Sequence, residues 1–208
     1  MTDLTRLDFF KLGDFMKQGQ WIGAALLLMT GLAQAQPIDY DYVDLSYRML
    51  DRSDAETLGD EFDGPAVRIS LGFADRFYGL IENTYLEADG AEVDLSDLVI
   101  GGGYRQSVAE DTDFFAEGAW VRRDVDTPNR FQDGKDDGFR VAAGVRYMAQ
   151  EMLELNIAAL YQAGLFDDNE AILRAGAAWS VYGPLGLQAG ASVSADSALY
   201  DLGLRVAF

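Results

Sequence analysis

The chain has 208 residues, of which 16 are Lys or Arg and 35 are Asp or Glu, so its net charge is −19. A chain this acidic is not expected to bind nucleic acid, because contacts with phosphates need clustered Lys and Arg. The sequence has no cysteine, which excludes disulfides and a thiol nucleophile, and it has no histidine.

The first 35 residues have the pattern of a secretory signal peptide. The apolar run over 21–32 is too short to span a bilayer, which takes about 20 residues. Ala33 and Ala35 are the small residues expected at the −3 and −1 positions of a signal-peptidase site. The acidic residues ahead of the run are unusual in a signal, and a start at Met16 would give a compact one. We expect a signal peptide over 1–35 and a single domain over 36–208; a retained membrane anchor is the alternative.

Residues 36–208 alternate between apolar and polar side chains, which is the period of a β-strand with two different faces. Over 43–49, for example, every second residue is apolar and those between are Asp, Ser or Arg. In 77–87 the phase is ambiguous, and Glu82 is placed inward only weakly. The pattern predicts ten strands, at about 40–49, 65–74, 77–87, 95–106, 112–123, 138–149, 152–164, 170–182, 185–194 and 198–208.

The connections between these strands alternate in length. The longer ones follow odd-numbered strands, at 50–64, 88–94, 124–137, 165–169 and 195–197. The shorter ones follow even-numbered strands, at 75–76, 107–111, 150–151 and 183–184. Long loops at one end and tight turns at the other are typical of outer-membrane barrels.

The last strand carries the most specific motif. Apolar or aromatic residues at 200, 202, 204, 206 and 208 alternate with small or charged ones. The spacing of Asp201, Gly203, Val206 and Phe208 resembles the closing strand of small Gram-negative outer-membrane β-barrel proteins. In that family this segment is recognised by the barrel-assembly machinery, so the resemblance implies the same role for these four residues. We therefore expect residues 36–208 to form an all-β, antiparallel, up-and-down transmembrane β-barrel of about ten strands, with eight as the alternative.

The polar face of these strands carries charges of both signs. In a soluble barrel such as a lipocalin this face would meet water, whereas in a membrane barrel lipid contacts the apolar face and the polar face lines the lumen. The mixture of charges and small residues favours a crowded lumen. The predicted lumen ion-pair network consists of Asp44, Arg48, Arg68, Asp97, Arg105, Glu117, Arg140, Arg146, Glu154, Arg174, Asp201 and Arg205.

Acidic residues concentrate in the predicted long loops. Solvated charge that keeps the loops soluble is the simpler interpretation. Coordination of divalent cations by oxygen ligands, shared with lipopolysaccharide, is the sharper one. Asp133, Asp136 and Asp137 are weak candidates for a metal site, because the segment lacks the ligand spacing of an EF-hand. No metal and no cofactor is otherwise expected.

The absence of histidine argues against catalysis. The lipases, deacylases and omptin-type proteases among outer-membrane barrels use a histidine as base or activator. We therefore expect a non-enzymatic barrel with a charge-plugged lumen and acidic extracellular loops, acting as a structural or surface-interaction protein. A narrow pore for small hydrophilic solutes or cations is the alternative.

This assignment also sets the expected location and partners of the chain. The location is the bacterial outer membrane, with the long loops extracellular and both termini periplasmic. The expected partners are outer-membrane lipid, lipopolysaccharide, the assembly machinery and, at the loops, divalent cations. We expect a monomer.

Overall fold

The structure is a computed structural model that describes residues 38–52, 61–88, 93–127, 134–166 and 168–208. The predicted signal peptide, its cleavage residues Ala33 and Ala35 and the possible start at Met16 lie outside these residues. No helix in the described residues is long and apolar enough to cross a membrane. The strands are β1 (Tyr42–Arg52), β2 (Glu61–Ala74), β3 (Phe77–Ala88), β4 (Asp94–Ala109), β5 (Thr112–Asp126), β6 (Gly134–Gln150), β7 (Leu153–Leu165), β8 (Asp168–Tyr182), β9 (Leu185–Val193) and β10 (Ser197–Ala207).

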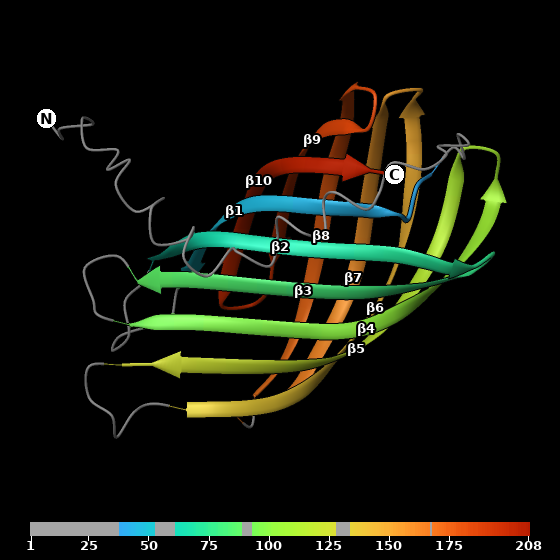
Figure 1. The fold of residues 1–208 in the computed structure, drawn as a ribbon. Coiled ribbons are helices and arrows are strands. Elements are labelled where there is room, and N and C mark those ends of the chain that lie inside the picture. Colours follow the sequence, from blue (N-terminus) through green and yellow to red (C-terminus); the bar gives the residue numbers. More distant parts are fainter. Residues whose placement is uncertain (1–37, 53–60, 89–92, 128–133, 167) are drawn as a thin grey trace, which may run out of the picture. The chain divides into compact units, whose positions relative to one another are not determined.

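The ten strands form one closed antiparallel barrel in which each strand pairs with its neighbours in the chain. The barrel closes between β1 and β10, which lie side by side in Figure 1. Their register runs from Tyr42 opposite Ala207 to Arg52 opposite Ser197 without interruption. Closure leaves no unpaired strand edge, which is the condition for placing a sheet in lipid. The prediction of an antiparallel ten-stranded barrel is confirmed, and the eight-stranded alternative is wrong.

Several strands differ at their ends from the prediction. β6 begins at Gly134, so Asp136 and Asp137, predicted in a loop, belong to this strand. The strand continues because charges pair across the hairpin, with Arg122 opposite Asp137 in β5 and β6. Apolar alternation cannot reveal such a segment, since its outward side chains are charged. The first strand also begins at Tyr42 and not at 40, because the residues before it turn into the barrel.

The two ends of the barrel have different connections. The short-turn end, as we name it, carries the connections 75–76, 110–111, 151–152 and 183–184. The long-loop end carries 53–60, 89–93, 127–133, 166–167 and 194–196. The predicted alternation therefore holds, although the last two connections at the long-loop end are short. Two of the tight connections use left-handed backbone, at Phe166 (φ 52°) and Gly183 (φ 54°).

The apolar face of the sheet points outward and the polar face points inward. Phe73 and Leu202, for example, are 72% and 64% exposed. Charged residues such as Asp44 and Glu82 are buried inside the barrel. This arrangement is the reverse of a soluble barrel and fits a sheet surrounded by lipid. The inward face is not uniformly polar, because apolar clusters lie there too, including Phe62, Leu86 and Leu95.

Candidate functional site: the charged lumen

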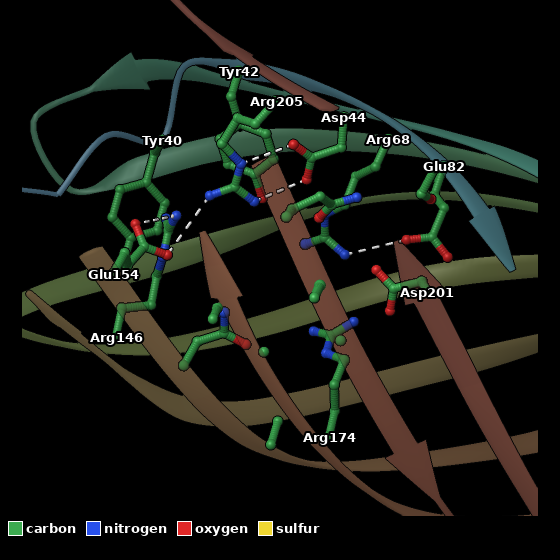
Figure 2. A pocket seen from close by; sticks show the side chains of 18 of the residues that line it. Tyr40, Tyr42, Asp44, Arg68, Glu82, Arg146, Glu154, Arg174, Asp201 and Arg205 are labelled. Atoms are coloured by element: carbon green, nitrogen blue, oxygen red, sulfur yellow. Dashed lines mark hydrogen bonds and ion pairs between the residues drawn. The ribbon is translucent and has the colours of Figure 1, made fainter. Parts of the chain in front are cut away.

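Two acids and two arginines meet inside the barrel toward the short-turn end, and we name Asp44, Arg146, Glu154 and Arg205 the short-turn cluster. Arg205 donates to both oxygens of Asp44 at 2.7 and 2.8 Å. Arg146 donates to both oxygens of Glu154 at 2.8 and 2.9 Å. Arg205 Nη1 also lies 3.6 Å from Glu154 Oε1 and joins the two pairs. Figure 2 shows these four side chains converging from β1, β6, β7 and β10.

Register explains why these side chains meet. Asp44 and Arg205 stand opposite each other where β1 and β10 close the barrel. Glu154 lies opposite Met148, two residues along β6 from Arg146, so the two charged side chains share the inward face. Such bidentate guanidinium–carboxylate pairs are among the stronger polar contacts in proteins.

Two side chains of the segment just before β1, those of Ile38 and Tyr40, lie inside the barrel next to this cluster. Ile38 and Tyr40 are each only 3% exposed. The Tyr40 ring lies 4.7 Å from the ring of Tyr78 on β3, and the guanidinium of Arg146 lies 4.3 Å from the Tyr40 ring centroid. Burial raises the pKa of the Tyr40 hydroxyl, which therefore stays neutral at ordinary pH. The segment adds an apolar and aromatic layer to the charged one.

A second set of charges lies in the middle of the barrel, and we name it the central cluster. Glu82 lies 3.1 Å from Arg48, 3.2 Å from Arg68 and 3.7 Å from Arg140. Glu117 lies 2.8 Å from Arg68 and 3.9 Å from Arg174. Two glutamates thus form ion pairs with four arginines, which come from four different strands. The cluster consists of Arg48, Arg68, Glu82, Glu117, Arg140 and Arg174.

These charges are removed from bulk water. The side chains of Glu82 and Glu117 are 5% and 7% exposed, and those of Arg48 and Arg68 are 15% and 11% exposed. A buried ion pair contributes little net stability but is costly to leave half-made. The lumen is therefore cross-linked by contacts that are costly to open one at a time.

Of the remaining predicted lumen residues, Asp97 and Arg105 lie on either side of the central cluster and Asp201 lies beside it. Asp97 is bound by both donors of Arg123, at 2.8 and 2.7 Å, toward the long-loop end. Arg105 lies at the short-turn end, where it donates to the carbonyl of Asp75 at 3.2 Å and to that of Ile38 at 3.4 Å. Asp201 is inward-facing on β10, and its carboxylate lies against Gly190 on β9.

Two cavities remain on either side of the central cluster. The cavity toward the short-turn end has a volume of about 90 Å³, and the one toward the long-loop end about 220 Å³. Arg48, Glu82, Arg174 and Asp201 line both. Figure 2 shows several of these residues pointing into the interior from different strands. The two cavities therefore share one layer of lining side chains.

All twelve residues of the predicted lumen network point inward, but they form more than one cluster. The predicted network did not include Glu82, although the structure places it at the centre of the cluster. Its phase was hidden because the inward residues Tyr78 and Leu80 are apolar and buried, so β3 alternates less clearly. Arg123 was also missed. It lies six residues from Glu117 on the same strand, an even spacing that puts both side chains on the inward face.

The other predicted sites have different surroundings. Gly203 in the closing strand lies so close to β1 that an added Cβ would be 2.1 Å from the Leu45 carbonyl oxygen. Asp201 is on the same inward face, Val206 lies near the end of β10, and Phe208 follows it.

Asp136 and Asp137, the two candidate metal ligands among the described residues, accept hydrogen bonds from other groups of the protein. Asp137 accepts from Arg122 at 2.8 and 3.0 Å, and Asp136 accepts from the backbone amides of Asp137 and Phe166. Asp133 lies outside the described residues. In the parts of the chain that the structure describes, no group of three or more acidic side chains is arranged to hold a metal ion.

Solved structures of outer-membrane proteins share this architecture. An outer-membrane channel from Pseudomonas putida F1 superimposes with a TM-score of 0.52 at 12% identity, over 87% of this chain and 100% of the other. The NanC porin gives a TM-score of 0.50 at 8% identity, over 79% of this chain and 100% of the other. The fold is that of the small outer-membrane β-barrels. No family model matches the chain, and no curated protein sequence matches it. At these identities the likeness shows the fold alone, and the function has to be argued from the residues of the lumen.

Proposed function

We propose that this outer-membrane β-barrel is a non-enzymatic structural or surface protein whose lumen is closed by ion pairs. The observation that carries the proposal is the central cluster, which spans the interior between the two cavities. Its six charged side chains come from strands on different sides of the barrel and meet within 4 Å of one another in pairs. A small barrel is expected to be filled by its own side chains, whereas wide porins have 16 or more strands.

The outer surface supports a location in the outer membrane. Phe77 and Tyr85 both point outward from β3, near opposite ends of the barrel, and are 48% and 37% exposed. At about 3.3 Å per residue and a tilt of about 40°, their spacing corresponds to about 20 Å along the barrel axis. That height is comparable with the apolar band of about 25 Å in barrels of this class. The aromatic side chains would then lie at the two interfaces.

We propose the orientation that is usual for barrels of this class. We place the long-loop end outside the cell and the short-turn end, with both termini, in the periplasm. Acidic side chains such as Asp124 and Asp126 on β5 then lie at the outer rim. We propose lipopolysaccharide as their neighbour, with divalent cations between carboxylate and phosphate. Protease cleavage of the long-loop end in intact cells tests this orientation.

A narrow pore is the second candidate, and one observation favours it. The two cavities share Arg48, Glu82, Arg174 and Asp201 as lining residues, so a rearrangement of a single layer would join them. Arg174 is the loosest member, because its one ion pair is 3.9 Å long and its side chain is 22% exposed. Movement of this side chain alone would widen the path.

Conductance separates the two candidates. The chain without residues 1–35 would be refolded, its fold confirmed by a heat-modifiable gel band, and its current recorded in a planar bilayer. A folded but silent barrel supports the closed lumen. Steady current steps that change when Arg174→Ala is introduced, but not with the outward-facing Arg122→Gln, support the pore and overturn the plug.

A further inference from the structure

The cavity toward the long-loop end has a charged floor, and its walls carry six aliphatic side chains among polar and charged ones. Its floor is formed by Arg48, Glu82, Arg140, Arg174 and Asp201, and its volume is about 220 Å³. This cavity is more than twice the volume of the one below it. It lies on the side of the barrel that carries the long connections.

The walls come from six different strands. Leu50, Ile172 and Leu199 each stand two residues along their strand from a charged residue of the floor, and a two-residue step keeps a side chain on the same face. Aliphatic side chains therefore lie directly above the charges of the floor, interleaved with polar and charged ones such as Gln162 and Glu170. The aliphatic side chains that line the cavity are Leu50, Leu86, Leu95, Leu160, Ile172 and Leu199.

These walls retain apolar surface that faces the cavity. Leu86, Leu95 and Leu160 are packed to 6% exposure or less, but Leu50, Ile172 and Leu199 are only half-buried. Apolar surface in contact with water is unfavourable by about 25 cal/mol per Å². An apolar group placed in the cavity would remove this contact.

The charges that line the cavity balance. Its basic residues are Arg48, Arg52, Arg123, Arg140 and Arg174, and its acidic residues are Glu82, Asp97, Glu170, Asp196 and Asp201. Arg174 is the arginine most able to bind another group, because its guanidinium lies 3.9 Å from its one acidic partner and remains 22% exposed. Arg48 is engaged by Glu82 and by Thr84, whose hydroxyl lies 2.5 Å away. An anionic group beside Arg174 would therefore add a close partner to the one long ion pair that this arginine makes.

We propose that this cavity binds a small monocarboxylate with an apolar chain. The carboxylate accepts hydrogen bonds from Arg174, and the chain packs against Leu50, Ile172 and Leu199. By proportion with a 150 Å³ cavity that holds benzene, a cavity of 220 Å³ holds roughly nine non-hydrogen atoms. Hexanoate, with eight, is of suitable size. The site rests on the closed central cluster proposed above, which forms its floor.

Titration calorimetry on the refolded barrel tests this site with hexanoate, 1-hexanol, hexylammonium and acetate as probes. Hexanoate is expected to bind, 1-hexanol and acetate at least about tenfold more weakly, and hexylammonium not at all. Arg174→Gln is expected to weaken hexanoate about tenfold or more and to leave 1-hexanol unchanged. Arg122→Gln, an arginine on the outer surface, is the matched control and should bind like the wild type. Ile172→Trp fills the cavity and should weaken both hexanoate and 1-hexanol.

Two results would overturn the proposal. One is a folded barrel that binds none of the four probes. The other is hexanoate affinity that Arg174→Gln and Arg122→Gln leave equally unchanged. Conductance recorded on the same preparation reports separately on the central cluster: a conducting barrel that still binds hexanoate contradicts the plug and keeps the site. A silent barrel without binding keeps the plug and removes the site.

Discussion

Removing Arg146 should destabilise the barrel far more than removing Arg174. The guanidinium of Arg146 binds both oxygens of Glu154 at 2.8 and 2.9 Å, and the two side chains are 7% and 9% exposed. Arg146→Ala leaves Glu154 buried with only Arg205, whose Nη1 is 3.6 Å away. Removing one partner of a buried ion pair lowers the free energy of unfolding by about 3–5 kcal/mol. The remaining contact with Arg205 offsets part of this, so we expect a loss of about 3–4 kcal/mol in the free energy of unfolding.

The smaller effect of Arg174→Ala follows from its geometry. Arg174 lies 3.9 Å from Glu117, and Arg68 holds the same carboxylate at 2.8 Å. Glu117 therefore keeps its main partner when Arg174 is removed. We expect a loss of about 1 kcal/mol or less, in the range of weak ion pairs. The two variants should differ by about 2–3 kcal/mol.

Urea unfolding of the barrel refolded in lipid vesicles measures this difference. Trp120 and Trp179 are exposed on the outer surface and report the transfer from lipid to water by fluorescence. The double variant Arg146→Met with Glu154→Leu removes both charges and should be close to wild type. Equal losses in Arg146→Ala and Arg174→Ala, or a double variant as unstable as Arg146→Ala, would refute the reasoning.

Three further predictions address other parts of the barrel. An added Cβ at Gly101 would lie 2.3 Å from the Gly118 carbonyl oxygen, so Gly101→Ala should lower the free energy of unfolding in urea by about 1–3 kcal/mol. Gly118→Ala should be neutral, because an added Cβ there meets nothing within 4 Å. Equal effects of the two variants would contradict the close approach of β4 and β5. Tyr40→Ala removes the ring that packs on Tyr78 and Arg146 and should raise the conductance of the barrel in planar bilayers. A current like that of the wild type would show that Ile38–Asp41 is not a barrier to ions. Leu202→Arg places a charge at a position that is 64% exposed on the outer face. It should lower the free energy of unfolding in vesicles by about 2–4 kcal/mol. An unchanged unfolding midpoint would argue against lipid contact at this position.

The sequence by itself determined the number of strands, their antiparallel order and the face that meets lipid. These features follow from the two-residue period, which is a local property that each segment carries alone. The closing strand was also readable, because its alternation runs without a break to the end of the chain. Strand ends were less readable where charged cross-strand pairs extend the ladder, as between Arg122 and Asp137.

The tertiary structure alone decided which charges meet. Asp44 and Arg48 lie four residues apart, which is about 13 Å along a strand and too far for a direct pair. Closure of the barrel brings Asp44 to Arg205, 161 residues away, and Arg48 to Glu82 on β3. The entry of the Ile38 and Tyr40 side chains into the lumen and the aliphatic side chains above the central cluster arise in the same way. Each depends on the register and closure of strands far apart in the sequence, and neither quantity is encoded in the period of any one strand.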